Sequence, residues 1–482
     1  MRNRTFVPWP ILLLVALGAG ACKDKSKALA EPDPVSADPT GSAAAPGPVS
    51  SVGTLNGVGV EGSKDGPWEV RRAGRGSGDT RRAGKGSGGP GLGAPGGKPS
   101  LARAKAAEAP SPMAAAPLAE AEEKSAGMTP PPAADMGGAP MKAGSTDDNA
   151  AFDEFLTFLA TWTDRAGLEN RYQKLDVKGR RFIRVVDGKD NPVPAAKVRV
   201  LGPDRDGSVW DAMTYGDGRT PYYGSLARGG QGGVSAVEAS YGGKRAVASW
   251  TGEGDVTVKL TDLAGISPEI QLDVLFLIDT TGSMGDEIER VKSTLLRVTE
   301  RLRELKTDFD LRYGAVLFRD IGDEYLTKTH AFTSDISAFD GALQQVRAGG
   351  GGDGPESVNQ ALAEAVSMGW REGAAKVAFL IGDAPPHMDY QGDLPYGDSA
   401  VRAIGKGLRV HSVAASGLDP VGTLVFRQTA QLCRGKFIFI EYGSKEESAR
   451  SHGVTGPVKS NNLDDIVFEQ IRDEVERWGK AE

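Results

Sequence analysis

One apolar run, followed at once by an acid and two hydroxyls, constrains this chain more than any other feature. The run is VLFLI, residues 274–278, within the stretch LDVLFLIDTTGS that ends at Ser283. A continuous apolar run of this length is typical of a strand buried on both faces of a parallel sheet. After it, apolar residues recur at spacings of three and four from Ile288 to Leu302, which predicts a long amphipathic helix. The stretch therefore predicts a strand, a polar turn and a helix.

Three oxygen-bearing side chains alternate along the polar turn: Asp279, Thr281 and Ser283. In an extended turn this alternation points all three to one side. One carboxylate and two hydroxyls that converge at a strand end suit a hard divalent cation, Mg²⁺ or Ca²⁺. The alternative is a capped helix start, because Asp, Ser and Thr are also favoured N-cap residues. These residues alone leave both interpretations open.

Two later predicted strands also end in acidic loops. The strand 376–381 runs into GDAPPH, which contains Asp383, and the strand 311–318 runs into RDIGDEY, which contains Asp320. Because the carboxyl ends of parallel strands share one edge of a sheet, we expect both carboxylates beside Asp279. A surface turn is an equally good interpretation of the RDIGDEY segment.

A glycine-rich loop lies between these two segments and reads AGGGGDGPESVNQAL. Its four consecutive glycines allow close backbone approach at a binding site. Its acids are Asp353 and Glu356. Glu356 has a second possible role, since an acid in the first turn of a helix stabilises that helix.

Residues 269–480 resemble a von Willebrand factor A domain, whose first metal-binding loop reads Asp-x-Ser/Thr-x-Ser. The resemblance implies an α/β fold with a doubly wound, mostly parallel sheet and a metal-ion-dependent adhesion site. The family often supplies a Thr from its second loop, and no Thr is present here, so Asp353 is expected in that role. The implied metal residues are Asp279, Thr281, Ser283, Asp353 and Asp383, with Asp320 and Glu356 as accessory groups.

The resemblance further implies a non-enzymatic module that binds a protein through Mg²⁺, or through Ca²⁺ or Mn²⁺. In adhesive members of the family a carboxylate of the partner fills an open position on the cation. One alternative is a structural envelope protein in which the metal only stabilises the fold. Another is a hydrolase built on Ser283 and His387, but the chain contains no GxSxG elbow for a serine nucleophile. Cys433, near a predicted helix end, is expected to be a buried, inert thiol.

The N-terminus predicts an export signal that ends at a lipid-attachment cysteine. Two arginines and a short apolar core, residues 11–17, precede small residues and then Cys22. This order resembles the lipobox of bacterial lipoproteins, and a residue other than Asp after the cysteine implies the outer membrane. An ordinary cleaved signal with an incidental cysteine is the alternative. The apolar core is too short to span a membrane.

Residues 23–147 are predicted to be a disordered linker, because Ala, Pro, Gly and Ser dominate them and little apolar surface is available for burial. Two basic repeats start at Arg71 and Arg81, but no aromatic residues interleave their charges, and the net charge of the chain is -7. Nucleic-acid binding is therefore not predicted. The linker would hold the folded part away from a lipid anchor in the membrane.

Two smaller folded segments are predicted before the A-type domain. Residues 148–179 carry an apolar helical stripe from Phe152 to Trp162, with Asp147 or Asp148 as the cap. This helix either packs on the next domain or binds a partner. Residues 180–265 show short alternating strands separated by Gly and Asp turns, which predicts a β-sandwich. The stretches VVDGKDNPVPAAKVRV and TYGDGRT resemble carboxypeptidase-regulatory-like modules, which have no catalytic residues of their own.

The position of Cys22 generates a prediction about anchoring. Cys22→Ala should release the protein from the membrane fraction or leave its signal uncleaved, because the thiol that accepts the lipid is gone. Membrane fractionation and electrophoretic mobility of the full chain test this. A Cys22→Ala protein that fractionates and migrates like the wild type would contradict the lipoprotein interpretation.

Overall fold

The computed structural model describes residues 68–71, 140–163, 165, 167–168, 170–204, 207–230, 232–263, 270–304, 309–352 and 354–479. All of them belong to one compact unit, Glu61–Glu482. The predicted export signal, Cys22 and most of the predicted linker lie outside the described residues, and so does Asp353. No helix of the described part is long and apolar enough to cross a membrane.

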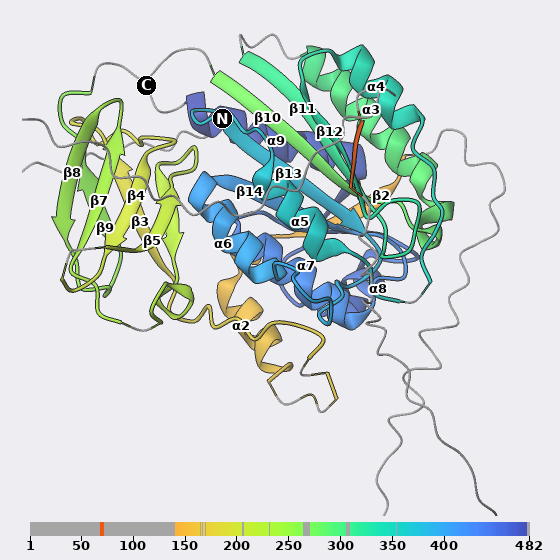
Figure 1. Ribbon diagram of the computed structural model, residues 1–482, viewed down its shortest axis with the longest axis horizontal. Coiled ribbons are helices and arrows are strands. Elements are labelled where there is room, and N and C mark those ends of the chain that lie inside the picture. The colour runs from red at the N-terminus through yellow and green to blue at the C-terminus, as the bar shows by residue number, and fades with distance from the viewer. Residues whose placement is uncertain are drawn as a thin grey trace, which may run out of the picture. The chain divides into compact units, whose positions relative to one another are not determined.

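A nine-stranded mixed sheet forms the largest part of the structure (Figure 1). At its centre, β10 (Ile270–Asp279) pairs in parallel with β11 (Phe309–Phe318) on one side and with β13 (Ala375–Gly382) on the other. The parallel part continues through β14 (Leu408–Ala414) and β15 (Phe437–Ile440). This arrangement confirms the predicted mixed α/β fold with a large, mostly parallel sheet.

Helices cover both faces of this sheet (Figure 1). One face carries α3 (Ile288–Glu304), α4 (Ile336–Gln344) and α9 (Leu463–Gly479). The other carries α5 (Val358–Ser367), α6 (Tyr396–Lys406) and α7 (Pro420–Leu432), and α8 (Lys445–Ser451) follows β15. Successive side chains of β10 alternate between the two apolar cores: Val274 and Phe276 face the first group of helices, and Leu275 and Leu277 face the second. The continuous apolar run thus reflects burial on both faces.

Antiparallel strands close the sheet at both edges. On one side β12 (Thr327–Thr333) pairs with β11, and β1 (Trp68–Arg71) pairs with β12. On the other, β2 (Lys142–Thr146) lies between β15 and β16 (Lys459–Asn462).

Strands β1 and β2 come from the segment 23–147, so the prediction of a disordered linker does not hold for residues 68–71 and 142–146. Small residues conceal the signal of β2. At Gly144, an added Cβ would lie 2.4 Å from the ring of Phe439, so only a side chain this small fits against β15. Because the side chains of β2 must be small, the strand lacks the alternation of apolar and polar residues from which a strand is predicted.

The segment before the smaller sheets contains α2 (Phe152–Ala160), as the apolar stripe predicts. The expected cap is wrong: the N-cap residue is Ala151, and Asp148 instead forms a buried ion pair with Arg427 of α7 at 2.7 Å. Phe155 of α2 lies in the apolar core, and the guanidinium of Arg427 stacks on Phe158. The helix therefore packs on α7, which covers the large sheet, whereas the sequence predicts packing on the domain that follows it or partner binding.

Two smaller sheets follow α2. One has the order β6-β3-β9 and the other β5-β4-β7-β8. Their strands are β3 (Arg181–Val186), β4 (Lys197–Leu201), β5 (Ser208–Met213), β6 (Arg219–Tyr222), β7 (Ala236–Tyr241), β8 (Lys244–Ser249) and β9 (Val256–Lys259). Side chains from both sheets, including Ile183, Trp210 and Val237, lie in one apolar cluster. Strand β4 begins only at Lys197, after Pro194, which has no N–H to donate, and Ala195, which has a φ of +52°.

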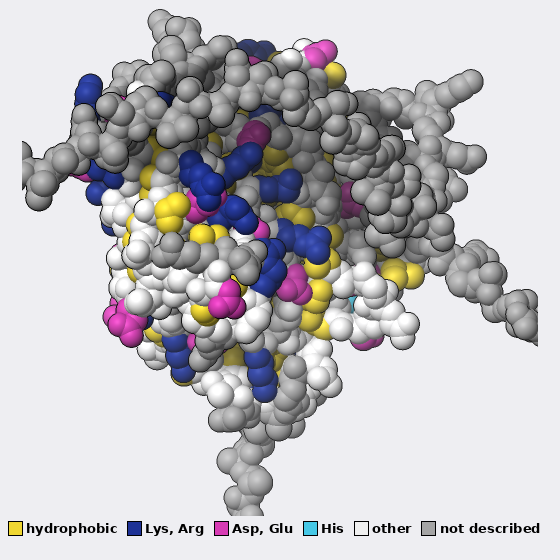
Figure 2. Space-filling view, turned by 60° about the vertical axis from the view of Figure 1, so that its left-hand side comes forward, with side chains coloured by type: hydrophobic (Ala, Val, Ile, Leu, Met, Phe, Trp, Pro, Cys, Tyr) yellow, Lys and Arg dark blue, Asp and Glu magenta, His cyan; other side chains and the backbone are white. Residues whose placement is uncertain are grey.

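The outer face of the four-stranded sheet carries alternating charges. Arg199 lies between Asp211, at 3.9 Å, and Glu238, at 3.6 Å, while Arg228 pairs with Asp211 and Arg245 with Glu238. Figure 2, in which the left-hand side of Figure 1 is turned forward, shows Lys and Arg side chains beside Asp and Glu and among hydrophobic ones. Pairs in which both partners are half-exposed, such as Arg228 with Asp211, contribute little to stability individually.

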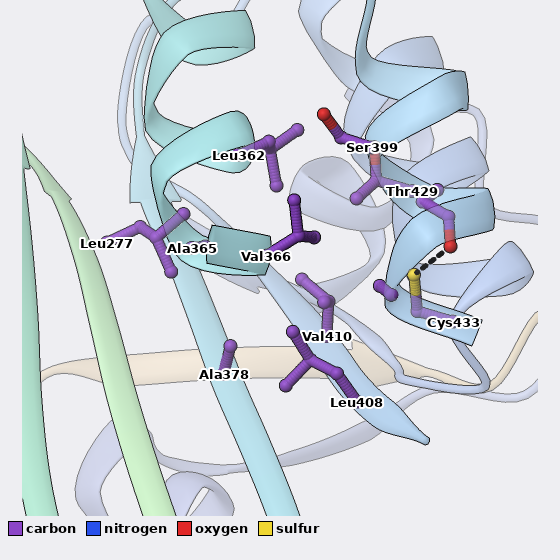
Figure 3. Close-up of a pocket in the computed structure, with 12 residues that line it drawn as sticks. Leu277, Leu362, Ala365, Val366, Ala378, Ser399, Leu408, Val410, Thr429 and Cys433 are labelled. Atoms are coloured by element: carbon purple, nitrogen blue, oxygen red, sulfur yellow. Dashed lines mark hydrogen bonds between the residues drawn. The ribbon is translucent and has the colours of Figure 1, made fainter. Parts of the chain in front are cut away.

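Cys433 is the C-cap residue of α7 and is buried, as predicted. Its thiol is free and fully buried, and it donates to the carbonyl of Ala400 at 3.7 Å. Burial raises the pKa of this thiol far above its usual range, so it stays protonated and unreactive. Cys433 lines a mainly apolar cavity of about 10 Å³, together with Leu277 and Val410. Figure 3 shows these side chains around the cavity. A space of this size holds at most one water molecule.

A fully buried carboxylate fixes the amino end of β10. Asp273 accepts hydrogen bonds from Nε and Nη2 of Arg312, at 2.9 and 2.7 Å. It also accepts bonds from the backbone N and Nε of Arg371, both at 2.9 Å. The carboxylate thus ties β10 to β11 and to the loop before β13.

Asp273→Ala should lower the free energy of unfolding by about 3–5 kcal/mol, because two guanidinium groups lose their buried counter-charge. Asp211→Ala is the matched control, since Asp211 also lies between two arginines but its side chain is 50% exposed. The control should cost about 1 kcal/mol or less. Urea unfolding at neutral pH measures both, and equal losses would contradict the role given to Asp273.

Candidate functional site

Asp279 is the last residue of β10 and is fully buried. Its Oδ1 accepts a hydrogen bond from the backbone N of Thr281 at 2.9 Å and another from Thr281 Oγ1 at 2.7 Å. The chain then enters a short 3₁₀ turn, Gly282–Asp286, that leads into α3. Asp279 therefore shapes the first loop and fixes the direction of the Thr281 hydroxyl.

Ser283 links this loop to the end of β13. Its Oγ lies 3.1 Å from Thr281 Oγ1 and donates to Asp383 Oδ1 at 3.0 Å. The parallel pairing of Ile278 with Ile381 places the two strand ends side by side. The structure thus brings together Asp279, Thr281, Ser283 and Asp383, four residues that the sequence predicts at one site.

Gly382 makes the close approach of the two carboxylates possible. A Cβ at this position would lie 3.1 Å from Cβ and 3.2 Å from Oδ2 of Asp279. These distances are shorter than ordinary van der Waals contacts, so a larger residue would push β10 and β13 apart at their ends.

At this site, Oδ2 of Asp279 and Oε2 of Glu356 are buried carboxylate oxygens that have no hydrogen-bond partner. Only 3% of the surface of Glu356 is exposed, and none of Asp279. Burial, reinforced by the negative charge of Asp383, raises the pKa of Asp279 to about 7. Burial, reinforced by neighbouring carboxylates with Asp279 first among them, raises the pKa of Glu356 to about 9. Buried oxygens without donors are costly, and a cation would satisfy them.

The glycine-rich loop lies against the first loop through backbone hydrogen bonds. Gly349 N donates to Thr280 O and Gly282 N donates to Gly350 O, both at 3.0 Å. Gly350 and Gly351 have φ values of +81° and +76°, which favour glycine. At Gly350, a Cβ would also lie 2.4 Å from the carboxyl carbon of Asp323. Glycine is therefore required here, as expected for a loop that approaches a binding site.

Asp320, at the end of β11, takes part in a separate network. Its carboxylate accepts hydrogen bonds from Ser357 Oγ at 3.0 Å and from Tyr390 OH at 2.8 and 3.0 Å. His387 Nε2 lies 3.5 Å from it, and the His387 ring stacks on Tyr390. Asp320 lies near the predicted edge of the sheet, but these contacts give it a role in positioning the loops around the site.

Ser283 and His387 take different partners in the structure. Ser283 bonds to Thr281 and Asp383, whereas His387 Nδ1 lies 2.9 Å from Asp389. These contacts do not have the order of a nucleophile, a base and an orienting acid that serine hydrolysis requires.

An open cleft of about 670 Å³ lies over these loops. Its lining consists of six glycines, two serines, one alanine and four acids, and the acids are Asp286, Glu287, Glu356 and Asp383. Within the described residues, no three His, Cys, Asp or Glu side chains are grouped so that they alone hold a metal ion. Any cation here would therefore rely on the hydroxyls of Thr281 and Ser283 as well.

Sequence reasoning did not identify Asp286, Glu287, Ser357 or Tyr390 as neighbours of the site. The first two follow the motif directly, where helix capping explains acids equally well. Ser357 and Tyr390 bond to Asp320 because two loops bring them together. The course of these loops cannot be predicted from a local sequence pattern. The predicted role of Asp353 falls outside the described residues.

Residues 273–392 match the family model of the von Willebrand factor A domain. This part of the chain matches such an A domain. Domains of this family commonly mediate protein interaction or adhesion.

Two curated proteins are similar to the chain over this region. The alpha-protein kinase vwkA of Dictyostelium discoideum is 34% identical over 131 residues, which cover 27% of this chain and 21% of that protein. Integrin beta-5 of Mus musculus is 22% identical over 152 residues, which cover 26% of this chain and 19% of that protein. The chain thus spans about a fifth of the length of these two relatives.

Two solved structures also resemble the chain. The conserved hypothetical protein BatB from Bacteroides thetaiotaomicron has 15% identity and a TM-score of 0.31, and the match covers 42% of this chain and 99% of that one. An aerotolerance-related membrane protein from Bacteroides fragilis has 13% identity and a TM-score of 0.29, with 43% and 99% covered.

The raised pKa values predict how the metal-free protein responds to pH. In the unfolded chain Asp279 and Glu356 ionise near 3.8 and 4.5, while in the folded protein they keep their protons up to about 7 and 9. The folded state therefore binds more protons between about pH 4 and 9, and its stability should fall as the pH rises through this window.

Asp279→Asn and Glu356→Gln should each flatten this dependence, because an amide does not ionise. Urea unfolding in the presence of a chelator, at several pH values, measures the slope for each protein. Variants whose stability falls with pH as steeply as that of the wild type would show that other groups cause the dependence.

Proposed function

We propose that the chain is an exported, membrane-anchored protein-binding module whose A domain captures a partner through a divalent cation. The observation that carries this proposal is the buried Oδ2 of Asp279, which has no partner and lies beside a converging set of oxygens. The family's common role in protein interaction and adhesion supports it.

The residues present fit a hard cation such as Mg²⁺, Ca²⁺ or Mn²⁺. Asp279, Thr281 and Ser283 would hold it, and Asp383 would act through a water molecule, as the family resemblance implies. All of these groups offer oxygen, which hard cations prefer. When bound, the cation would supply a positive charge to which a carboxylate of the partner binds.

The contacts of the metal-free site already orient these groups. Asp279 Oδ1 holds Thr281 through two hydrogen bonds, which leaves Oδ2 for the cation. Asp383 holds Ser283 at 3.0 Å. Such preorganisation lowers the cost of ordering side chains when a ligand binds.

Glu356 is the better candidate for the place of the missing Thr in the second loop. Its backbone is fixed by Glu356 N to Pro385 O, at 2.9 Å, and by His387 N to Glu356 O, at 3.1 Å, which join the second loop to the third. Its buried Oε2 without a partner supports a part in cation binding. The alternative is that Asp353 supplies this ligand.

Export and anchoring rest on the N-terminal sequence, in which Cys22 follows a signal-like segment. In its most specific form, the proposal is that the chain is a lipoprotein of the outer membrane. The two smaller sheets would form a carboxypeptidase-regulatory-like sandwich between the linker and the A domain. Their stretch VVDGKDNPVPAAKVRV supports this assignment.

Two other functions remain to be separated from protein capture by experiment. In a purely structural role, the cation would raise the melting temperature without adding affinity for any partner. The kinase activity named for the Dictyostelium protein belongs to a chain of which this one spans 21%. We propose a non-enzymatic role, because the described side chains of the site suit a cation, and Ser283 and His387 bond to different partners.

Asp279→Ala should abolish divalent-cation binding, because it removes the only carboxylate of the alternating motif Asp279, Thr281 and Ser283. Thr281→Ala and Ser283→Ala should weaken binding, since each removes one neutral oxygen, and Asp383→Ala should weaken it about tenfold or more. Isothermal titration calorimetry with Mg²⁺, Mn²⁺ and Ca²⁺ measures these affinities, and circular dichroism verifies the fold.

Asp190→Ala is the matched control, because this turn residue of the smaller sheets is also an acid but is 71% exposed and paired with Lys259. It should bind cations like the wild type. A folded Asp279→Ala protein with undiminished binding would place the cation elsewhere and remove the basis of the proposal.

A further inference from the structure

The outer face of the three-stranded sheet β6-β3-β9 carries two arginines that lie directly opposite each other. Arg184 of β3 pairs with Arg219 of the antiparallel strand β6, so both side chains leave the sheet on the same side. The preceding pair of the ladder, Ile183 with Thr220, is fully buried, which places the arginines on the outer side. Like charges directly opposite each other in a sheet cost stability. A bound anion is one explanation for such a pair.

Neither of the two arginines forms an ion pair with an acid of the described residues, because the flanking acids bind other cations. Arg184 donates to the backbone carbonyl oxygen of Asp190 at 3.2 Å, whereas the Asp190 carboxylate pairs with Lys259 at 3.0 Å. Asp217, two residues before Arg219, pairs with an arginine of the large fold. The two opposed arginines therefore keep their charges.

Phe182 brings two further arginines to the same face. It lies two residues before Arg184 on β3 and therefore points to the same side. The guanidinium carbons of Arg180, Arg219 and Arg434 lie 5.0, 5.8 and 5.5 Å from the centre of its ring. Burial lowers the pKa of Arg180, and the like charge of Arg434 adds to this effect. Four arginines thus gather on this part of the face.

Arg434 belongs to the large fold and has an uncommon backbone conformation. It follows Cys433, the C-cap residue of α7, with a φ of +58°, where glycine is favoured. Its guanidinium donates to both carboxylate oxygens of Asp217, at 2.8 and 2.7 Å. It precedes β15, at the amino ends of the parallel strands, whereas Asp279 and Asp383 lie at the carboxyl ends. The arginine cluster is therefore separate from the candidate cation site.

The remaining acids near the cluster compensate only part of its charge. The carboxylate of Asp255, just before β9, accepts a hydrogen bond from a backbone N–H of β3 and is exposed to solvent. Asp147 acts on Arg180 and also on Lys436, so its charge is shared between two cations. Arg180 donates only to neutral groups, the side-chain and backbone oxygens of Asn149, at 3.0 and 3.4 Å. The face therefore keeps a net positive charge.

We propose that this arginine cluster binds a phosphate monoester group, carried by a soluble molecule or by a lipid headgroup. A planar guanidinium offers paired N–H donors that match phosphate oxygens. Arg184 and Arg219 hold the phosphate from the two strands, and Phe182 keeps Arg219 in place. A phosphate monoester carries a charge of about −1.5 to −2 at neutral pH, which offsets the repulsion between the two arginines. This inference does not depend on the proposed cation-dependent capture.

Inorganic phosphate is the first probe. Isothermal titration calorimetry of the full chain, in buffer freed of divalent cations by a chelating resin, should show binding. Arg184→Gln and Arg219→Gln should each weaken it about tenfold, because each removes a charge-assisted hydrogen bond. Arg199→Gln is the matched control, since it removes a half-exposed arginine from the other small sheet, where Asp211 and Glu238 flank it. This control should bind phosphate like the wild type.

Thermal unfolding separates a binding role of Arg219 from a structural one. In chloride, Arg219→Gln should unfold at the same temperature as the wild type or at a higher one, because the like-charge pair is gone. Phosphate at the same ionic strength should raise the melting temperature of the wild type but not that of Arg219→Gln. An Arg219→Gln protein that is less stable in chloride and still gains stability from phosphate would contradict the proposed site.

Vesicles separate the two sources of the phosphate group. The full chain with Cys22→Ala, which removes attached lipid as a cause of retention, is sedimented with phosphatidylcholine vesicles that contain or lack phosphatidic acid. Retention that requires phosphatidic acid and is lost on adding Arg184→Gln would assign a lipid headgroup. Phosphate binding without such retention would assign a soluble ligand.

Two results would overturn the inference. One is a wild-type protein that binds neither inorganic phosphate nor phosphatidic acid. The other is undiminished phosphate binding by the folded variants Arg184→Gln and Arg219→Gln. Both results would leave cation-dependent capture intact, because the two sites share no residue.

Discussion

The parallel pairing of β10 with β13 is the constraint on which the rest of the candidate site depends. It brings the ends of two buried strands side by side and leaves Asp279 and Asp383 at the same edge. Gly382 permits the approach, and the hydroxyls of Thr281 and Ser283 then bridge the carboxylates. The glycine-rich loop can close over this edge only because its backbone needs no side-chain room. Each element of the site therefore follows from one register in the centre of the sheet.

Two fully buried aspartates lie six positions apart on β10, and their surroundings differ in a way that separates stability from function. Asp273 is held by two arginines and ties three segments together. Asp279 has hydroxyl and amide donors on one oxygen and none on the other. A buried group without a partner costs stability and needs an explanation, and a bound ion is one such explanation. The comparison identifies the carboxyl end of β10, and not its amino end, as the place where a ligand is expected.

The sequence predicts the parallel centre of the sheet well, because continuous apolar runs and helical periodicity are local signals. It also predicts the convergence of Asp279, Thr281, Ser283 and Asp383, since strand ends in a parallel sheet share an edge. It fails for β2, where small residues such as Gly144 are selected by contact with Phe439 and carry no strand pattern. It also fails for the cap of α2, because Asp148 is taken by Arg427 of a distant helix. Contacts between residues far apart in the sequence determine both the strand β2 and the cap of α2. Such contacts cannot be recognised from a short stretch of neighbouring residues.

Strand β2 has a consequence for the order in which the chain folds. Thr146 pairs with Phe437 and Lys142 with Asn462, so β2, which precedes the smaller sheets, completes a large sheet most of whose strands come after them. The smaller sheets are thus inserted between two parts of one fold. During synthesis, β2 must remain unpaired until nearly the whole chain has emerged. Loop closure over such a sequence distance is slow, so the smaller sheets would fold first and the edge of the large sheet last. A chaperone that shields exposed strand edges would be most useful to this chain during that interval.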